Sequence, residues 1–186
     1  MNIDFKSLFT KAMGPEIAPY PYQILLATND WPDIVKIETG MGKTAGIILA
    51  WLYKRLLEDP RTPRRLIYCL PMRVLVEQTA SCAGRWIERL VDSKIIPPEK
   101  QPSVYVLMGG DIDNDWDRYP EKEAILIGTQ DQLLSRALNR GFATSRFRWP
   151  IQFGLLNNDC MWVMDEVQLM GSGLATTAAP TDAATF

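Results

Sequence analysis

The stretch that decides the fold is residues 34–44, which read Ile34-Val35-Lys36-Ile37-Glu38-Thr39-Gly40-Met41-Gly42-Lys43-Thr44. An apolar run precedes the glycines and a second one, residues 45–52, follows them, which predicts a strand, a tight loop and a helix. Glycines allow backbone N–H groups to close on a phosphate because no Cβ stands in the way, and the start of a helix adds the positive end of its dipole. The Lys43 ammonium can reach the β- and γ-phosphates, and the Thr44 hydroxyl can hold Mg²⁺. Residues 39–44 therefore predict a nucleotide-binding loop.

The composition limits the kinds of function that the chain can perform. The sequence has 186 residues and ordinary apolar and charged fractions, so we expect one globular domain. It contains no histidine, which excludes a histidine-based metal nuclease or acid–base mechanism within this chain. The net charge is −2, so the chain has no overall basic field, and any contact with nucleic acid must come from local groups or from a partner.

The cysteines and the hydropathy pattern predict a cytoplasmic location. Cys69, Cys82 and Cys160 are far apart and odd in number, which favours free thiols in a reducing compartment. No apolar run is long enough to span a membrane. Asp4 and Lys6 interrupt the N-terminal segment, where a signal peptide would be apolar.

Apolar runs and breaker residues alternate along the chain in a way that is typical of an α/β fold. We expect helices at residues 5–13, 22–29, 44–59, 73–91, 130–140 and 149–157. Strands are expected at 34–38, 65–70, 103–108, 124–128 and 161–164. Because the strands are apolar on both faces, we predict a mostly parallel sheet with helices on both faces. Ligands bind at the carboxyl ends of such strands, where we place Lys43 and the acidic pair Asp165-Glu166.

The acidic pair predicts the second half of a Mg-nucleotide site. The apolar run 160–164 ends in Asp165-Glu166-Val167-Gln168. Asp165 would hold Mg²⁺ directly or through water, and Glu166 would orient and polarise the attacking water. Alone, such a pair is more often a solvated turn. Its position after a phosphate loop in a parallel α/β chain favours the catalytic interpretation.

Taken together, these motifs resemble the first RecA-like domain of a superfamily 2 helicase of the DEAD/DEVH type. The matching stretches run in the family's order: 21–23, 38–44 (motif I), 71–79 (Ia), 109–110, 128–131 (Ib) and 165–171 (II). The sequences of residues 128–138 and 165–171 are more narrowly similar to the helicase part of the CRISPR-associated helicase–nuclease of type I systems. The resemblance divides the chain into an approach segment (1–20), an ATP-binding domain (21–178) and an irregular tail (179–186).

The resemblance implies roles for individual residues. ATP would be bound by the adenine-reading Gln23 and by loop residues 39–44, with Thr44 and Asp165 on Mg²⁺ and with Lys43, Asp165 and Glu166 as catalytic residues. Single-stranded DNA would contact Arg73, Gly109, Gly110, Thr129 and Gln130. Without the family, each of these residues has a simpler interpretation. Gln23 could be a surface amide and Arg73 a solvated arginine. Gly109-Gly110 could form a glycine turn, and Thr129-Gln130 a plain helix N-cap.

The loop 111–117 is similarly open to interpretation. It lacks the glycine and the glutamate of a calcium loop, so we interpret it as a solvated acidic loop. Within it, Trp116 is a possible base-stacking residue.

The family also implies partners. These are a second RecA-like domain that supplies an arginine to the ATP cleft, a nuclease, and an RNA-guided surveillance complex. The Ser/Thr-Ala-Thr motif is missing and residues 179–186 look like a truncated end, so we expect the isolated chain to bind Mg-ATP weakly and to hydrolyse it poorly. Two functions remain: the ATP-binding half of a DNA helicase, or a non-catalytic remnant or competitor of that helicase. An unrelated P-loop kinase or GTPase fits less well, because no guanine-specificity motif is found.

Overall fold

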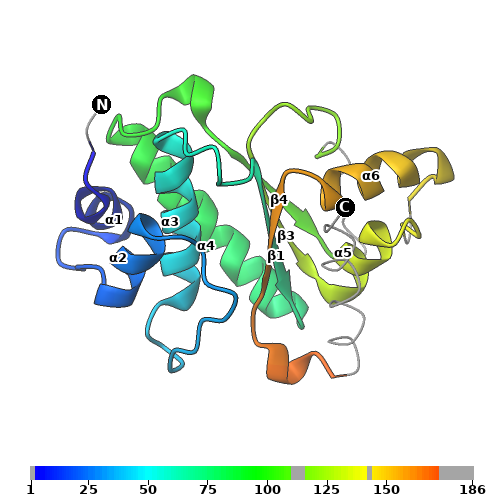
Figure 1. The fold of residues 1–186 in the computed structure, drawn as a ribbon, viewed down its shortest axis with the longest axis horizontal. Coiled ribbons are helices and arrows are strands. Elements are labelled where there is room, and N and C mark those ends of the chain that lie inside the picture. Colours follow the sequence, from blue (N-terminus) through cyan, green and yellow to red (C-terminus); the bar gives the residue numbers. More distant parts are fainter. Residues whose placement is uncertain (1–2, 110–115, 142–143, 172–186) are drawn as a thin grey trace. The chain divides into compact units, whose positions relative to one another are not determined.

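The computed structural model of this chain describes residues 3–109, 116–141 and 144–171 (Figure 1). The chain forms two compact units. The first unit comprises Met1–Thr62 and Ser81–Gln101, and the second comprises Pro63–Ala80 and Pro102–Phe186. One long helix, α4 (Arg73–Asp92), contributes its first turns to the second unit and the remainder to the first.

The first unit is helical. Its elements besides α4 are α1 (Phe5–Met13), α2 (Pro21–Thr28), α3 (Lys43–Leu56) and the short 3-10 helix η1 (Pro98–Lys100). Residues 45–52 of α3 are all buried, and α1 and α2 pack against this helix. The rings of Phe5 and Tyr53 meet edge to face, with centroids 5.5 Å apart, and thereby join α1 to α3. The buried apolar residues of α3 therefore fix this helix, and with it the phosphate loop at its start, within the first unit.

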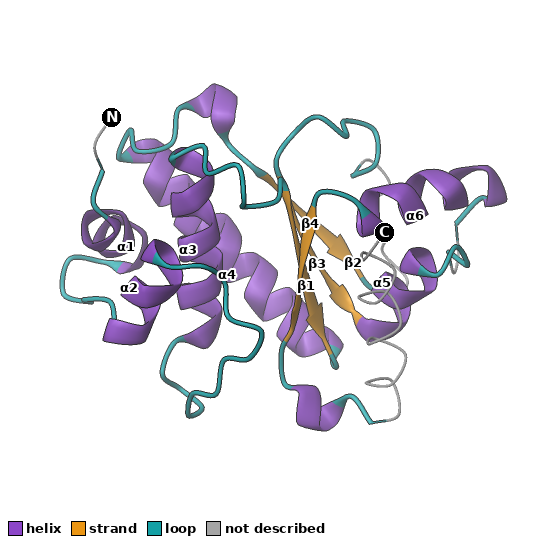
Figure 2. Cartoon of the chain, in the orientation of Figure 1, coloured by secondary structure: helices purple, strands orange, loops and turns teal. Residues whose placement is uncertain are grey.

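The second unit is built on a four-stranded parallel sheet in the order β2-β3-β1-β4 (Figure 2). The strands are β1 (Arg65–Leu70), β2 (Ser103–Leu107), β3 (Ala124–Thr129) and β4 (Cys160–Met164). Helices α5 (Gln130–Ala137) and α6 (Trp149–Asn157) pack against each other and against the sheet. The short 3-10 helix η2 (Arg146–Arg148) directly precedes α6, and η3 (Val167–Leu169) follows β4. This sheet confirms the predicted α/β fold with parallel strands.

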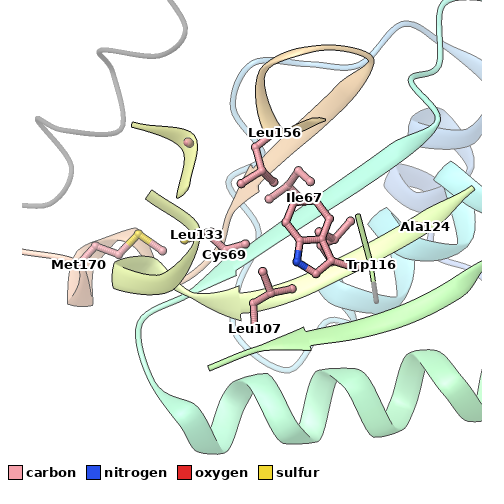
Figure 3. Close-up of a cluster of buried hydrophobic side chains, with 10 residues drawn as sticks. Ile67, Cys69, Leu107, Trp116, Ala124, Leu133, Leu156 and Met170 are labelled. Atoms are coloured by element: carbon pink, nitrogen blue, oxygen red, sulfur yellow. The ribbon is translucent and has the colours of Figure 1, made fainter. Parts of the chain in front are cut away.

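Two expectations about the loop 111–117 are wrong: the solvated acidic loop and the base-stacking role of Trp116. Residues 110–115 lie outside the described residues, but Trp116 is only 3% exposed and packs in the core near Ile67, Leu107 and Leu156 (Figure 3). Trp116 is therefore a core residue and not an open stacking platform. The Asp117 side chain is 6% exposed and pairs with Arg148, so this carboxylate is buried and not solvated.

The strand predicted at 34–38 is wrong, because no part of 34–38 forms a strand in this structure. Ile34 is 82% exposed, while Val35 and Ile37 are half-buried. A strand needs a neighbour for its backbone hydrogen bonds, and the four paired strands all belong to the second unit. Lys43 consequently follows an irregular segment rather than the carboxyl end of a strand.

The remaining predictions on elements differ from the structure only at the ends of helices and strands: β2 ends at Leu107, β3 ends at Thr129 and β4 begins at Cys160, each one residue from the predicted bound. Helix α3 ends at Leu56 and not near residue 59, and α5 ends at Ala137 and not at residue 140. All three cysteines are free, and burial raises the pKa of Cys69 to about 12 and of Cys160 to about 11. None of the helices formed by the described residues is long and apolar enough to cross a membrane.

Candidate nucleotide and nucleic-acid site

The phosphate loop lies in the first unit and ends at the first residue of α3. Gly40 and Gly42 have φ angles of 84° and 73°, in the left-handed region that favours glycine. Gly42 is the N-cap of α3, and no side chain of the described residues caps this end. The first N–H groups of a helix have no partner within the helix. The loop therefore presents backbone donors and the positive helix end, which together suit a phosphate.

Lys43 folds back across this loop. Its Nζ donates a hydrogen bond of 3.1 Å to the Ile37 carbonyl oxygen. Thr39 is exposed in the turn, and Thr44 is half-buried in the first turn of α3. A charged phosphate oxygen is a stronger acceptor than a carbonyl, so the ammonium can exchange the carbonyl for a phosphate.

Helix α2 supports the loop from beside it, through two consecutive residues. The Tyr22 hydroxyl donates to the Met41 carbonyl oxygen at 2.7 Å. The Gln23 Nε2 donates to the Gly42 carbonyl oxygen at 2.9 Å, and the Gln23 Oε1 accepts from the Tyr20 N–H at 2.8 Å. Gln23 is 1% exposed, and burial raises the pKa of Tyr22. Sequence reasoning missed Tyr22, although its place beside Gln23 was a signal.

The space for Gln23 is made by Gly46 in α3. A Cβ on Gly46 would lie 2.9 Å from the Gln23 Cγ, closer than atoms of this kind approach. Alanine usually stabilises a helix by about 1 kcal/mol relative to glycine, but overpacking costs about 1–3 kcal/mol. We therefore expect Gly46→Ala to lower the free energy of unfolding by about 1 kcal/mol, measured by urea denaturation.

Gly84→Ala in α4 is the matched control, because a Cβ there meets nothing within 4 Å. This variant should be more stable than the native chain, by up to about 1 kcal/mol. Equal stabilisation by both substitutions would show that Gly46 does not make room for Gln23.

The acidic pair lies in the second unit, at the carboxyl end of β4. The Asp165 N–H donates to the Cys69 carbonyl oxygen at 3.1 Å and so extends the β1–β4 pairing by one residue. The Asp165 Oδ2 accepts from the Tyr68 hydroxyl at 2.7 Å, and its Oδ1 accepts from the Glu166 N–H at 2.9 Å. Tyr68 is fully buried in β1. The Asp165 carboxylate is thereby held in one orientation.

Glu166 is backbone-strained. Its φ angle is 54°, in the left-handed region that non-glycine residues adopt at a cost. Its Oε2 accepts a hydrogen bond from Gln168 Nε2. This left-handed residue stands between β4 and η3 and turns the chain directly after Asp165.

The oxygen donors fit a magnesium ion. Mg²⁺ in nucleotide sites is held by one or two carboxylates together with phosphates and water. Each Asp165 oxygen has two lone pairs and uses one of them to accept a hydrogen bond just described, so among the described residues one lone pair on each oxygen is available. Thr44 and Asp165 belong to different units, the first and the second.

These two half-sites can be compared with known families. The sequence model of the DEAD/DEAH box helicase family matches residues 23–178. The chain belongs to the DEAD/DEAH box helicase family. The comparison with curated proteins found no match. The match includes the phosphate loop and the acidic pair, and it confirms the prediction of a superfamily 2 helicase domain with an ATP-binding fold.

In this DEAD/DEAH box helicase domain, the residues expected to contact nucleic acid follow the carboxyl ends of three strands. Arg73 begins α4 after β1, Gly109 follows β2, and Thr129-Gln130 join β3 to α5. Arg73 and Gly109 are brought together, since a Cβ on Gly109 would lie 2.6 Å from the Arg73 Nη2. A side chain at position 109 would displace the exposed end of Arg73, which is a small shift for so flexible a side chain. Gly110 lies outside the described residues.

The junction between β3 and α5 has donors available. Thr129 is the N-cap of α5, but its side chain makes no capping hydrogen bond within the described part of the helicase domain. The Gln130 Nε2 is buried and has no hydrogen-bond partner among the described residues. The Thr129 side chain therefore does not act as a plain N-cap, which was the alternative interpretation.

The buried Arg136 lies beneath this junction and was missed by sequence reasoning. Its Nη1 donates to both the backbone and the side-chain oxygen of Gln132 at 2.7 Å, and burial lowers its pKa. A fully buried arginine in a short amphipathic helix has no sequence signal of its own.

Proposed function

We propose that this chain is the ATP-binding first RecA-like domain of a helicase that moves on single-stranded DNA in type I CRISPR interference. The observation that carries the nucleotide part is the loop 39–44, with two left-handed glycines, an uncapped helix start and the Lys43 ammonium folded across it. Support for the DNA substrate and the CRISPR role comes from the sequences of residues 128–138 and 165–171, which resemble the CRISPR-associated helicase–nuclease.

In this proposal, each residue has a defined task. The loop donors and Lys43 would bind the phosphates, and Thr44 and Asp165 would each offer an oxygen ligand to Mg²⁺, which would offset charge on the transferred phosphoryl group. Glu166 orients the attacking water and accepts its proton. Gln23 reads the adenine edge of the nucleotide. Arg73, Gly109, Gly110, Thr129 and Gln130 bind the DNA backbone. A second RecA-like domain, a nuclease and an RNA-guided surveillance complex complete the system.

The test is the rate of ATP hydrolysis by the purified chain, with and without single-stranded DNA or RNA. We expect a slow rate for the chain alone, below the ordinary range of about 1–10³ s⁻¹, and its loss in Lys43→Ala and in Glu166→Gln. Stimulation by RNA but not DNA would contradict the DNA substrate. Nucleotide binding without any turnover would favour the non-catalytic competitor, and failure to bind a surveillance complex in a pull-down would contradict the CRISPR role.

Tyr68 is expected to tune the metal affinity of this site. Groups that orient a metal ligand typically change metal affinity by about 10- to 100-fold when they are removed. Tyr68→Phe should therefore weaken binding of Mn²⁺ in the presence of ATP by about tenfold or more, as measured by electron paramagnetic resonance.

The control is Tyr105→Phe, which removes a hydroxyl from β2 of the same sheet. It should leave the Mn²⁺ affinity unchanged. Equal affinities in the native chain and in Tyr68→Phe would show that the hydrogen bond to Asp165 does not position this carboxylate for the metal.

A further inference from the structure

Helix α6 exposes apolar side chains on the face opposite to the one that it buries. It contains no charged residue, and its apolar residues are spread around the whole helix, although a helix at a protein surface normally has one polar face. The buried face includes Gln152 and Leu156, both 0% exposed. On the other face Ile151 is 53% exposed, and Phe147, four positions earlier in η2, is 92% exposed. These two side chains therefore add little to the core of the second unit.

Gly154 extends this exposed face by another turn. Phe147, Pro150, Ile151 and Gly154 have the spacing that follows one side of a helix, and we call these four residues the α6 stripe. A glycine within a helix is destabilising relative to alanine, yet a Cβ on Gly154 would have no atom within 4 Å. The packing of the described residues thus gives no reason for a glycine here. What Gly154 does provide is a shallow notch next to Ile151, where another molecule can approach closely.

The α6 stripe is held in a fixed position. The Asp117 Oδ2 accepts hydrogen bonds of 3.0 Å from both Arg148 Nε and Gln152 Nε2. At the other end of the helix, the Leu155 carbonyl oxygen accepts from Arg65 Nε at 3.1 Å. A surface that is already ordered loses little entropy when it binds, so the α6 stripe is suited to recognition.

Helix α6 lies at the amino ends of the strands (Figure 1), because Arg65 begins β1 and the chain passes from α6 directly into the start of β4. Asp165 and Thr129, by contrast, are at the carboxyl ends of their strands. A partner on the α6 stripe would therefore leave the carboxyl edge of this sheet open.

The charges around the α6 stripe are positive. Residues 138–157 contain Arg140, Arg146 and Arg148 and no aspartate or glutamate, in a chain whose net charge is −2. Arg148 is paired with Asp117, whereas Arg140 and Arg146 are exposed. The Arg146 guanidinium lies 5.9 Å from the centroid of the Trp149 ring, at the start of α6. Carboxylates on a partner would complement this surface.

Two other occupants fit these observations less well. Nucleic acid binds mainly through a series of phosphate contacts, but the side chains of the α6 stripe are apolar and carry no donor. A two-fold dimer places the same patch on both sides of its interface. It would bring the arginines of two copies together in a segment without a carboxylate, which is unfavourable.

We propose that the α6 stripe is a docking surface for an acidic amphipathic segment of a partner protein. The segment places apolar side chains on Phe147 and Ile151 and carboxylates beside Arg146, a form of recognition that uses anchors three or four positions apart. The inference concerns the second unit and does not depend on nucleotide binding by loop 39–44, which belongs to the first.

The test begins with a library of random peptides displayed on phage and selected on the full chain. Peptides that also bind Gly154→Leu are discarded, because a leucine at this position fills the notch. We expect the retained peptides to carry apolar residues three or four positions apart and more Asp and Glu than Lys and Arg. No retained peptide, or retained peptides without this acidic excess, would overturn the inference.

The most enriched peptide, labelled with fluorescein, then gives affinities by fluorescence anisotropy. Phe147→Ala should weaken its binding by about tenfold or more, since aromatic anchors dominate interfaces of this kind, and Arg146→Glu should weaken it by a similar factor. Two control variants should retain the native affinity. Ile34→Ala removes an apolar side chain that is 82% exposed in the first unit, and Gly84→Leu adds a leucine to α4, where a Cβ also meets nothing within 4 Å.

Three further results would overturn the inference. The first is equal peptide affinity in the native chain and in Phe147→Ala. The second is binding of an oligo(dT) strand that is lost in Phe147→Ala, which would assign the stripe to nucleic acid. The third is a dimer in sedimentation that dissociates in the same variant, which would assign it to a second copy of the chain. Phe147→Ala decides the question even if Gly154→Leu fails to fold, because Phe147 is 92% exposed. Lys43→Ala should keep the native peptide affinity, so a failure of nucleotide binding leaves this inference intact.

Discussion

Replacing Arg65 with methionine is expected to cost this protein about 3 kcal/mol or more of its free energy of unfolding. Arg65 is 7% exposed at the start of β1, and burial lowers its pKa. Its three nitrogens donate to the carbonyl oxygens of Leu155, Pro120 and Asn158, at 3.1, 2.8 and 2.9 Å. Methionine fills a similar volume but leaves three acceptors without their donor, at about 1 kcal/mol or more for each.

Thermal denaturation followed by circular dichroism measures this effect. For a chain of this size, a loss of 3 kcal/mol corresponds to a fall of the midpoint by about 6–12 °C. The matched control is Arg64→Met, one residue earlier. The Arg64 side chain is 39% exposed and forms an exposed ion pair with Asp159, so its removal should cost no more than about 1 kcal/mol. Similar losses in the two variants would show that the buried hydrogen bonds of Arg65 are not what stabilises the second unit.

The second large effect is expected in Lys43→Ala, which should weaken Mg-ATP binding by roughly 10- to 150-fold. The removed interaction is a hydrogen bond between two charged groups, a class that contributes about 1.5–3 kcal/mol. The free energy of unfolding should change by less than about 0.5 kcal/mol, because the one hydrogen bond described for Lys43 joins it to the backbone of its own loop.

Calorimetric titration with ATP and urea denaturation measure the two quantities on the same sample. Lys36→Ala is the control, because Lys36 is an exposed lysine in the same approach to the loop and should change neither. Loss of the folded state in Lys43→Ala would contradict the assignment of this lysine to an open phosphate loop. Unchanged ATP affinity would contradict its role in binding phosphate.

Much of the second unit could be predicted from the sequence. The strands at 65–70, 103–107, 124–129 and 160–164 are short apolar runs bounded by breakers and separated by helices, a pattern that parallel strands produce locally. Asp165 at the end of β4 follows from the same reasoning, because the chain itself places an acid directly after a buried strand.

The errors of prediction arise where a side chain or a strand depends on a distant partner. Residues 34–38 carry an apolar pattern, but pairing needs a neighbouring strand, and no local signal says whether one is present. Trp116 lies in a polar stretch, yet its ring is buried by residues from β1, β2 and α6. The hydrogen bond from Tyr68 to Asp165 joins residues 97 positions apart.

The sequence by itself determined the α/β class, the nucleotide loop and the acidic pair, because backbone conformation and residue chemistry within a few positions are enough to produce them. Only the tertiary structure decided what Gln23, Tyr22 and Tyr68 do. A buried polar group must find a hydrogen-bond partner, and folding alone sets which distant group comes within reach.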